Sequence, residues 1–344
     1  MDRKPTMNDV ARLAGVGTMT VSRVLNDSAP VSAEAAERVY RAIEQLGYRP
    51  NEMARALRGV KSRSIGMIVP HLYDSFFATI AHEINTVARE HGYSVILATS
   101  DEDPDLEFTE AELMLQRRVD GLIVIPAEAS RSRLIHAEFD RTHIVTLDRP
   151  TQARRFDSVL VENQSGGRQA VEHLIGEHGH RHIVFIALNR QLYTMRARFD
   201  GYRRAMIEAG LRPESSFKCA TQELTSAAIG DLMRQKDPPT AFFCANNLTT
   251  RYALRALLDL GVCVPEEVAL IGFDDFELAE ILQPTLTVVR QPVYELGRVA
   301  AGMLFDRLDR DEFPSDGNKV VLPVELVIRR SCGCRTGVRA AAAD

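Results

Sequence analysis

The sequence of 344 residues lacks any run of about 20 apolar residues, the length needed to cross a bilayer as a helix. Its first residues are polar and do not resemble the apolar core of a secretory signal peptide. The five cysteines are odd in number and stand mostly in apolar runs, which fits reduced thiols better than a disulfide framework. We therefore expect a cytoplasmic protein without disulfide bonds and without a membrane partner.

Motifs that cradle phosphates or activate a serine are also missing. No Gly-x-Gly-x-x-Gly follows a predicted strand, and there is neither a Walker loop nor a Gly-x-Ser-x-Gly motif. Two motifs are rich in metal-binding residue types. His178-Gly179-His180-Arg181-His182 indicates a solvated turn between a helix and a strand, and Cys332-Gly333-Cys334 is one residue short of a zinc knuckle, lacks a partner pair and indicates a loose tail. We expect no enzyme, no metal site and no cofactor.

The net charge of −5 is distributed unevenly. Residues 1–63 hold 11 Lys and Arg against 7 Asp and Glu, a net of +4, so the remaining residues sum to −9. A basic N-terminal segment ahead of an acidic body favours a contact with a polyanion that is confined to this segment. Charge alone also allows a chance asymmetry.

The first 47 residues predict three short helices. Thr6 has the properties of an N-cap for a helix over Met7–Ala14. A second helix is predicted over Thr18–Leu25, and a third, capped by Ser32, over Ala33–Leu46. Two short helices joined by a three-residue turn have the spacing of a helix-turn-helix.

From Ser64 onward, apolar strands alternate with amphipathic helices. The predicted strands are Ile65–Val69, Val95–Ala98, Gly121–Ile125, Ile144–Leu147, Val159–Val161, Ile183–Ala187, Ala241–Cys244, Val268–Gly272 and Leu286–Val289. Predicted helices include Phe77–His91, Ser165–His178, Arg198–Ala209 and Leu248–Leu260. This pattern predicts an α/β body of two doubly wound parallel sheets, each covered on both faces. Ligands of such folds bind at the carboxyl ends of the strands.

The headpiece motifs carry a resemblance to a known family. The chain contains Asp9-Val10-Ala11-Arg12-Leu13-Ala14-Gly15-Val16, then Met19-Thr20-Val21-Ser22-Arg23-Val24-Leu25-Asn26, then Leu46-Gly47-Tyr48-Arg49-Pro50-Asn51. Together with Leu270-Ile271-Gly272-Phe273-Asp274 in the body, these motifs resemble the LacI/GalR family of transcriptional repressors. The resemblance covers essentially the whole chain.

The resemblance implies a domain order and a function. Residues 1–50 are expected to form an all-α helix-turn-helix headpiece, and residues 51–61 a hinge helix. Residues 62–335 would form a two-lobed, periplasmic-binding-protein-like domain for effector binding and dimerisation, followed by a tail over 336–344. The family's function is sequence-specific repression in which a small molecule in the inter-lobe cleft controls affinity for the operator.

The resemblance also assigns the DNA contacts. They are expected at Thr18, Met19, Thr20, Ser22, Arg23, Asn26, Arg55, Leu57 and Arg58. Arg23 can bond guanine O6 and N7 in the major groove, and Leu57 can act as an apolar wedge in the minor groove. The alternatives are that Met19 packs in the head core, that Arg23 contacts a phosphate, and that Leu57 packs on the body.

For the effector, the resemblance selects polar and aromatic residues near strand ends. They are Asp74, Phe76, Phe77, Glu128, Asp148, Arg198, Asn246, Asp274 and Gln291. Phenylalanine can stack on a sugar ring, and carboxylate and guanidinium groups can bond adjacent hydroxyls. We expect a monosaccharide or sugar acid. The alternative effector is a nucleobase or another non-sugar molecule. The alternative role of Phe76 and Phe77 is packing in the core. The alternative protein class is a solute receptor without a DNA function.

Three positions depart from the family's pattern. Gly17 stands where a Ser or Thr usually caps the recognition helix, and Asn247 stands where Asp is usual. Purine-binding relatives have a second arginine six residues before Arg198, where this chain has Leu192, which favours a sugar. The effects of the first two departures stay open.

A pseudo-palindromic operator needs two heads, so we expect a homodimer. No heptad repeat follows Cys332, which favours a dimer over a tetramer.

Overall fold

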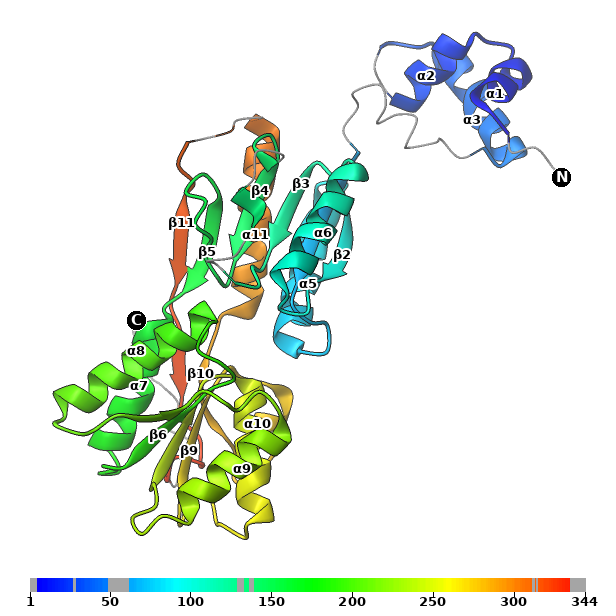
Figure 1. Ribbon diagram of the computed structural model, residues 1–344. Helices are drawn as coiled ribbons and strands as arrows, with labels where there is room; N and C mark the ends of the chain where they lie inside the picture. The colour runs from blue at the N-terminus through cyan, green and yellow to red at the C-terminus, as the bar shows by residue number, and fades with distance from the viewer. Residues whose placement is uncertain are drawn as a thin grey trace, which may run out of the picture. The chain divides into compact units, whose positions relative to one another are not determined.

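The computed structural model describes residues 5–26, 29–48, 62–128, 133–135, 139–310, 313 and 315–334. The chain forms two compact units, residues 1–62 and residues 63–344, which we call the head and the body (Figure 1). Residues 51–61, for which a hinge helix is predicted, and the predicted tail lie outside the described residues, so Arg55, Leu57 and Arg58 stay predictions. No helix in the described ranges combines the length and apolar character needed to cross a bilayer.

The head consists of α1 (Met7–Ala14), α2 (Thr18–Asn26) and α3 (Ala33–Leu46). The Thr6 side chain accepts a hydrogen bond from the Asp9 amide, and the Thr6 amide donates to the Asp9 carboxylate, so Thr6 is the predicted N-cap and the two residues form a capping box. The helices pack around Val10, Val21 and Val39, all fully buried. The three predicted helices are therefore confirmed.

The first lobe of the body is built on a parallel sheet in the order β11-β5-β4-β3-β1-β2. Its strands are β1 (Ser64–Val69), β2 (Ser94–Thr99), β3 (Gly121–Val124), β4 (His143–Leu147), β5 (Asp157–Val161) and β11 (Lys319–Leu322). Its helices are α5 (Ser75–Glu90), α6 (Pro104–Gln116), α11 (Val293–Arg310) and the short η1 (Arg133–Ile135).

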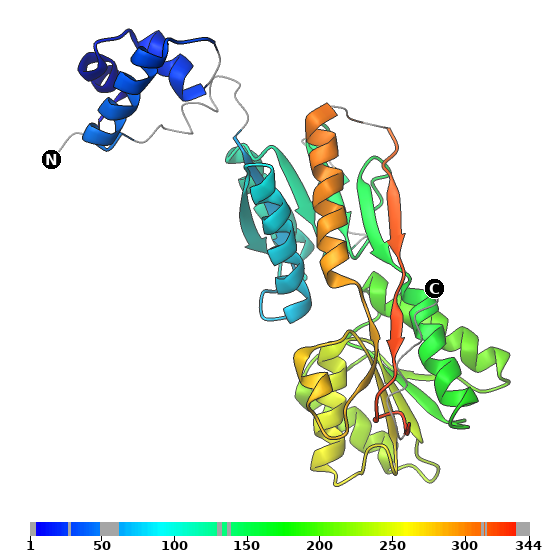
Figure 2. The same cartoon turned by 180° about the vertical axis from the view of Figure 1, so that it is seen from behind.

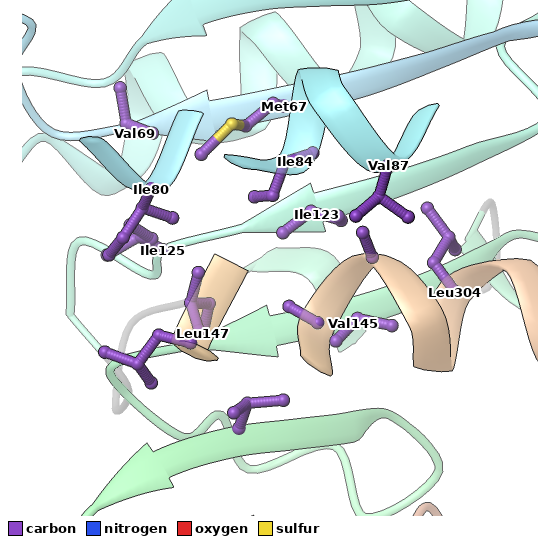
Figure 3. Packing of buried hydrophobic residues seen from close by; sticks show 14 of the residues in the cluster. Met67, Val69, Ile80, Ile84, Val87, Ile123, Ile125, Val145, Leu147 and Leu304 are labelled. Atoms are coloured by element: carbon purple, nitrogen blue, oxygen red, sulfur yellow. The ribbon is translucent and has the colours of Figure 1, made fainter. Parts of the chain in front are cut away.

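Both faces of this sheet are covered, as predicted. Successive side chains of a strand point to opposite faces, so Met67 and Val69 of β1 pack toward α5 and α11, while Ile68 packs toward α6. Figure 3 shows the first of these cores, where side chains of β1, β3 and β4 meet those of α5 and Leu304 of α11. Helix α5 begins shortly after β1 ends, so its first residues lie at the carboxyl end of that strand.

The second lobe repeats this plan with the order β12-β10-β9-β8-β6-β7. Its strands are β6 (Ile183–Ile186), β7 (Glu214–Ser216), β8 (Ala241–Cys244), β9 (Ala269–Phe273), β10 (Thr287–Arg290) and β12 (Glu325–Val327). Its helices are α7 (Asn163–Gly176), α8 (Tyr193–Glu208), α9 (Gln222–Met233), α10 (Asn247–Asp259) and the short η3 (Glu277–Glu280). Only β12 among these six strands is antiparallel to its neighbour. The predicted two-sheet α/β class is confirmed.

The chain passes between the lobes three times, as the ribbon shows from behind (Figure 2). It crosses after β5, between β10 and α11, and between β11 and β12. The connections are one or two residues long, so the lobes are joined closely on one side.

Several elements differ from the sequence-based expectation. Helix α8 begins at Tyr193 rather than near Arg198, and α5 begins at Ser75 rather than Phe77. Strands β7, β11 and β12 are not among the predicted strands. They have three or four residues, and polar or exposed positions interrupt their apolar pattern, so periodicity alone does not reveal them.

Candidate functional sites

Two aspartates end equivalent strands of the two sheets. Asp148 follows β4 and Asp274 follows β9, and each of these strands is third from the edge formed by β11 or β12. Both aspartates have a left-handed backbone, with φ of 64° and 74°. Such a conformation is unfavourable for a residue with a side chain and is concentrated at functional sites. Both carboxyl groups are buried.

Arg198 is a buried cation of this region. Its Nε donates to Asn163 Oδ1 at 2.8 Å and its Nη1 donates to the Ala245 carbonyl at 2.6 Å. The guanidinium lies 3.6 Å from the centre of the Phe273 ring and 3.7 Å from Asp274 Oδ2. These contacts hold one flat face of the guanidinium against the end of β9. Its remaining donors are suited to a polar ligand.

Burial acts on all three charged groups. It raises the pKa of Asp274 to about 6, although Arg198 and a hydrogen bond from Gln291 lower it. Burial also raises the pKa of Asp148, against the effect of Arg149 and Arg198. It lowers the pKa of Arg198, although Asp274 and Asp148 raise it. Asp148 of the first lobe and Arg198 of the second lobe therefore each affect the pKa of the other.

Unpartnered buried atoms surround these charges. Asp148 Oδ1, Gln291 Oε1, Asn247 Oδ1 and Ser100 Oγ are buried and have no hydrogen-bond partner within the described residues. Each residue directly follows a strand or opens a helix at the carboxyl ends of the sheets. Because a buried polar atom without a partner is costly, this set fits a site that a hydrogen-bonding ligand completes.

Asn247, one of the departures from the family's pattern, joins the two lobes. Its Nδ2 donates to Asp74 Oδ1 at 2.8 Å. Asp74 caps α5 in the first lobe by accepting from the Phe76 amide, and Asn247 is the first residue of α10 in the second lobe. An aspartate at position 247 would place two carboxylates at this point. Asparagine at this position instead donates a hydrogen bond from the second lobe to the first.

We predict that Asn247→Asp weakens the contact between the two lobes. Two carboxylates about 3 Å apart disfavour each other's charge, and the hydrogen bond from residue 247 to Asp74 is lost. Effector affinity is expected to fall by about tenfold, a loss of about 1.4 kcal/mol. Isothermal titration calorimetry measures the affinity, and Asn247→Ala, which removes the bond without adding charge, is the control. Equal losses for both variants would show that repulsion has no part in the effect.

The structure brings most of the predicted effector residues to this region, but it separates others from it. Phe76, Asp274 and Gln291 line a pocket of about 530 Å³ between the start of α5, η3 and the start of α11. Phe76 and Phe77 are 9% and 6% exposed and both belong to the first core, which weakens the expected role of either ring in stacking. The carbonyl oxygen of the Asn246 side chain is used as the N-cap of α10. Glu128 is partly buried beyond β3. The residues that do not line that pocket are Asp74, Phe77, Glu128, Asp148, Arg198 and Asn246.

Two residues of the region, Asn163 and Tyr193, were missed by sequence reasoning. Asn163 orients Arg198 and follows β5 by two residues, so the strand-end rule would have found it. Tyr193 opens α8, and its pKa is raised by burial and by the charge of Asp148, which acts on it from the other lobe. Arg149 makes a two-pronged ion pair with Glu102, at 2.5 and 2.8 Å, and also donates to two carbonyls, so its role is to hold the loop after β4.

In the head, α2 presents its first turn to solvent. Thr18 and Arg23 are exposed, and Met19 is 68% exposed, which excludes the alternative that Met19 packs in the core. Thr20 and Ser22 are partly buried beside the buried Val21, and nothing is described of the Asn26 side chain. Apart from its chain neighbours, no heavy atom of the described residues lies within 4 Å of the position that a Cβ on Gly17 would take, so a serine cap would fit among them.

Comparison with known protein families covers both units. The profile of bacterial regulatory proteins of the lacI family matches residues 6–51, and that of the periplasmic binding protein-like domain matches residues 171–332. The HTH-type transcriptional repressor PurR of Haemophilus influenzae is 34% identical over 95% of this chain and 98% of its own length. PurR of Pasteurella multocida is 32% identical over 96% and 99%.

Solved structures agree with these matches. The lac repressor dimer bound to operator and the anti-inducer ONPF is 26% identical, with a TM-score of 0.84 over 96% of this chain and 99% of its own. The transcriptional regulator CelR in complex with cellobiose is 32% identical, with a TM-score of 0.69 over 95% and 99%. These relatives are repressors and regulators, not enzymes. The chain therefore belongs to the LacI family and is a DNA-binding transcriptional repressor.

Proposed function

We propose that this repressor is controlled by a purine nucleobase that binds between the lobes of the body. The observation that carries the proposal is the similarity to PurR repressors over 95% of the chain. The sugar that the sequence favoured becomes the second candidate. Curated relatives named PurR in Haemophilus, Pasteurella and Aliivibrio all match over most of their length.

The polar groups between the lobes are compatible with a purine. A guanidinium such as that of Arg198 matches the O6 and N7 acceptors of a purine edge. Carboxylates such as those of Asp148 and Asp274 accept hydrogen bonds from ring N–H groups. Phe76 and Tyr193 offer aromatic surface near these groups, and proteins commonly bind bases by stacking together with edge hydrogen bonds.

A monosaccharide is the second candidate, and one observation favours it. Leu192, which stands where purine-binding relatives have a second arginine, is 5% exposed and belongs to the core of the second lobe. The site therefore lacks a second guanidinium at that point. Two solved relatives hold sugars: CelR with cellobiose, and a protein from Alkaliphilus metalliredigens with D-xylulofuranose.

For the DNA-bound state, we propose a homodimer on a pseudo-palindromic operator, associated with the nucleoid. Thr18, Met19 and Arg23 of each head would read bases, and Leu57 would enter the minor groove. Effector binding would close the cleft and change the spacing of the two hinge segments. Coupling of this kind is reciprocal and typically amounts to about 1–3 kcal/mol, or 5- to 150-fold in operator affinity.

The test begins with selection of the operator from a pool of random duplexes. Fluorescence anisotropy then measures operator affinity with hypoxanthine, guanine, ribose, glucose or no addition. The proposal is supported if purines, and not sugars, change operator affinity by about 5- to 150-fold. A shift with a sugar only would replace the purine with the second candidate, and no shift with either would reject both. The direction of the shift distinguishes a corepressor from an inducer.

Effector binding is expected to depend on the ionisation of Asp274, whose pKa is raised to about 6. If the effector donates a hydrogen bond to this carboxylate, it binds the charged form. At pH 5 roughly a tenth of the chains are charged at a pKa of 6, so affinity should rise about tenfold from pH 5 to 7 and level off above. Titration calorimetry at several pH values measures this change, and in Asp274→Asn the profile should be flat.

The free energy of unfolding without effector should fall as pH rises, in the opposite direction to effector affinity. Because burial raises the pKa of Asp274 in the folded state from 3.8 to about 6, ionisation of this carboxyl destabilises the fold, so the stabilising contribution is complete below about pH 3.8 and is lost as pH rises through about 6. Thermal unfolding without ligand at the same pH values separates the two effects. A pH profile of affinity that stays flat in the unaltered protein would contradict the role given to Asp274.

A further inference from the structure

Two histidines and two cysteines that are far apart in the sequence meet at one point of the second lobe. They are His173, His178, Cys332 and Cys334, whose ligand-type atoms all lie within 4.8 Å of one another. The sequence-based expectation of a loose tail at Cys332-Gly333-Cys334 is wrong, because Cys332 is fully buried and Cys334 is partly buried. The missing partner pair is supplied by α7 and the turn after it.

The distances within the cluster match the edges of a small tetrahedron. His173 Nε2 lies 3.4 Å from Cys332 Sγ and 3.7 Å from Cys334 Sγ, and His178 Nε2 lies 3.3 Å from Cys334 Sγ. Four ligands at the usual Zn–S and Zn–N bond lengths stand roughly 3.3–3.8 Å apart in a tetrahedron. The two imidazole rings are inclined at 76°, so they approach from different directions. An ion at the centre would need only small side-chain shifts.

We propose that His173, His178, Cys332 and Cys334 bind one zinc ion in a closed, structural Cys₂His₂ site. Thiolate and imidazole ligands in a tetrahedral arrangement select zinc over the hard cations that prefer oxygen. Four protein ligands leave no open position for a substrate, so the site is structural rather than catalytic.

The surrounding residues hold the ligands in place. Thr287 Oγ1 donates a hydrogen bond to Cys332 Sγ at 3.2 Å, as outer partners of metal ligands commonly do. Gly333 has a φ of 104°, and a Cβ there would lie 3.2 Å from His178 Nδ1, so glycine allows both cysteines to turn toward one point. The hydroxyl of Ser331, just before the turn, accepts a hydrogen bond from the Thr287 amide and donates one to the Leu270 carbonyl. The other histidines of the turn bond elsewhere, His180 to Thr240 and His182 to Glu214.

The position of the cluster indicates what the ion would do. It lies near the amino ends of β6 and β9, whereas the effector region lies at the carboxyl ends of the strands. It joins α7 to the segment after β12, which are 156 residues apart between His178 and Cys334. A cross-link over such a separation limits the unfolded chain and stabilises the folded lobe.

Metal content and cobalt spectra test the proposal. The full chain, purified without an affinity tag in a reducing buffer, is expected to contain about one zinc per chain by mass spectrometry. Reconstitution with Co²⁺ is expected to give the intense visible bands of tetrahedral cobalt and a thiolate charge-transfer band. Cys334→Ser and His178→Gln should each lower zinc per chain by about tenfold or more.

Matched controls are Cys263→Ser, at an exposed cysteine outside the cluster, and His180→Gln, at the neighbouring histidine of the same turn. Both should keep zinc at the unaltered level. A chelator should lower the melting temperature of the unaltered protein and of the controls but leave Cys334→Ser unchanged. If a ligand variant fails to fold, zinc content and the cobalt spectrum of the unaltered chain decide alone. The proposal would be overturned by absence of zinc or by an octahedral cobalt spectrum. It would also be overturned if Cys332 and Cys334 formed a disulfide in the protein purified in reducing buffer.

Discussion

Arg198→Ala is expected to weaken effector binding by about 100-fold or more, because it removes the buried guanidinium that lies 3.7 Å from Asp274 Oδ2. The variant loses the hydrogen bonds to Asn163 and Ala245 and the contact with the Phe273 ring. It also leaves the buried Asp274 carboxylate without its cation, and truncating one partner of a buried charge pair costs about 2–5 kcal/mol. Calorimetric titration with the effector measures the loss.

Two further variants make this prediction specific. Arg203→Ala, on the exposed side of the same helix and paired with Asp200, should leave effector affinity unchanged. Arg198→Lys keeps the charge but not the planar fork, so its affinity should lie between those of the unaltered protein and the alanine variant. Operator binding without effector should survive in all three. An Arg198→Ala repressor that still responds fully to effector would remove Arg198 from the site.

The second large effect is expected in the head. Arg23→Ala should reduce discrimination at one base pair of each half-site by about 1–3 kcal/mol, since a bidentate contact to guanine contributes about that much. Arg23 is exposed on α2, one turn after Thr18 and Met19. Anisotropy titrations against the selected operator and its single-base variants measure the discrimination.

Contrasting arginines separate base reading from phosphate contact. Arg12→Ala alters an exposed arginine of α1 that is paired with Asp9, and it should leave base preference intact. Arg58→Ala, outside the described residues, should weaken all sequences alike and flatten the dependence on salt. If Arg23→Ala also weakened every duplex equally, Arg23 would be a phosphate contact.

Much of the body could be predicted because long apolar strands are strong signals. Apolar runs marked where β4 and β9 end, and the resemblance to the family selected Asp148 and Asp274 at these ends. Their left-handed backbone and raised pKa depend on packing by distant residues, which no local pattern contains. Phe77 illustrates the limit, since a core position and a ligand-facing position have the same sequence appearance at the start of a helix.

The cluster of His173, His178, Cys332 and Cys334 could not be predicted for a different reason. Its histidines and its cysteines are separated by more than 150 residues, and spacing rules apply only to ligands that share a local segment. Their meeting depends on the antiparallel strand β12, which returns the chain to the amino ends of the other strands. The strand itself has three residues and no clear alternation.

The triple passage of the chain between the lobes has a consequence for synthesis on the ribosome. Strand β5 takes its neighbour β11 from far along the chain, and Asp157 of β5 binds Arg307 of α11, 150 residues later. A nascent chain that ends before residue 319 cannot complete the first sheet. The early part of the body must therefore wait, with one strand edge and part of an apolar face uncovered, until nearly the whole protein has emerged.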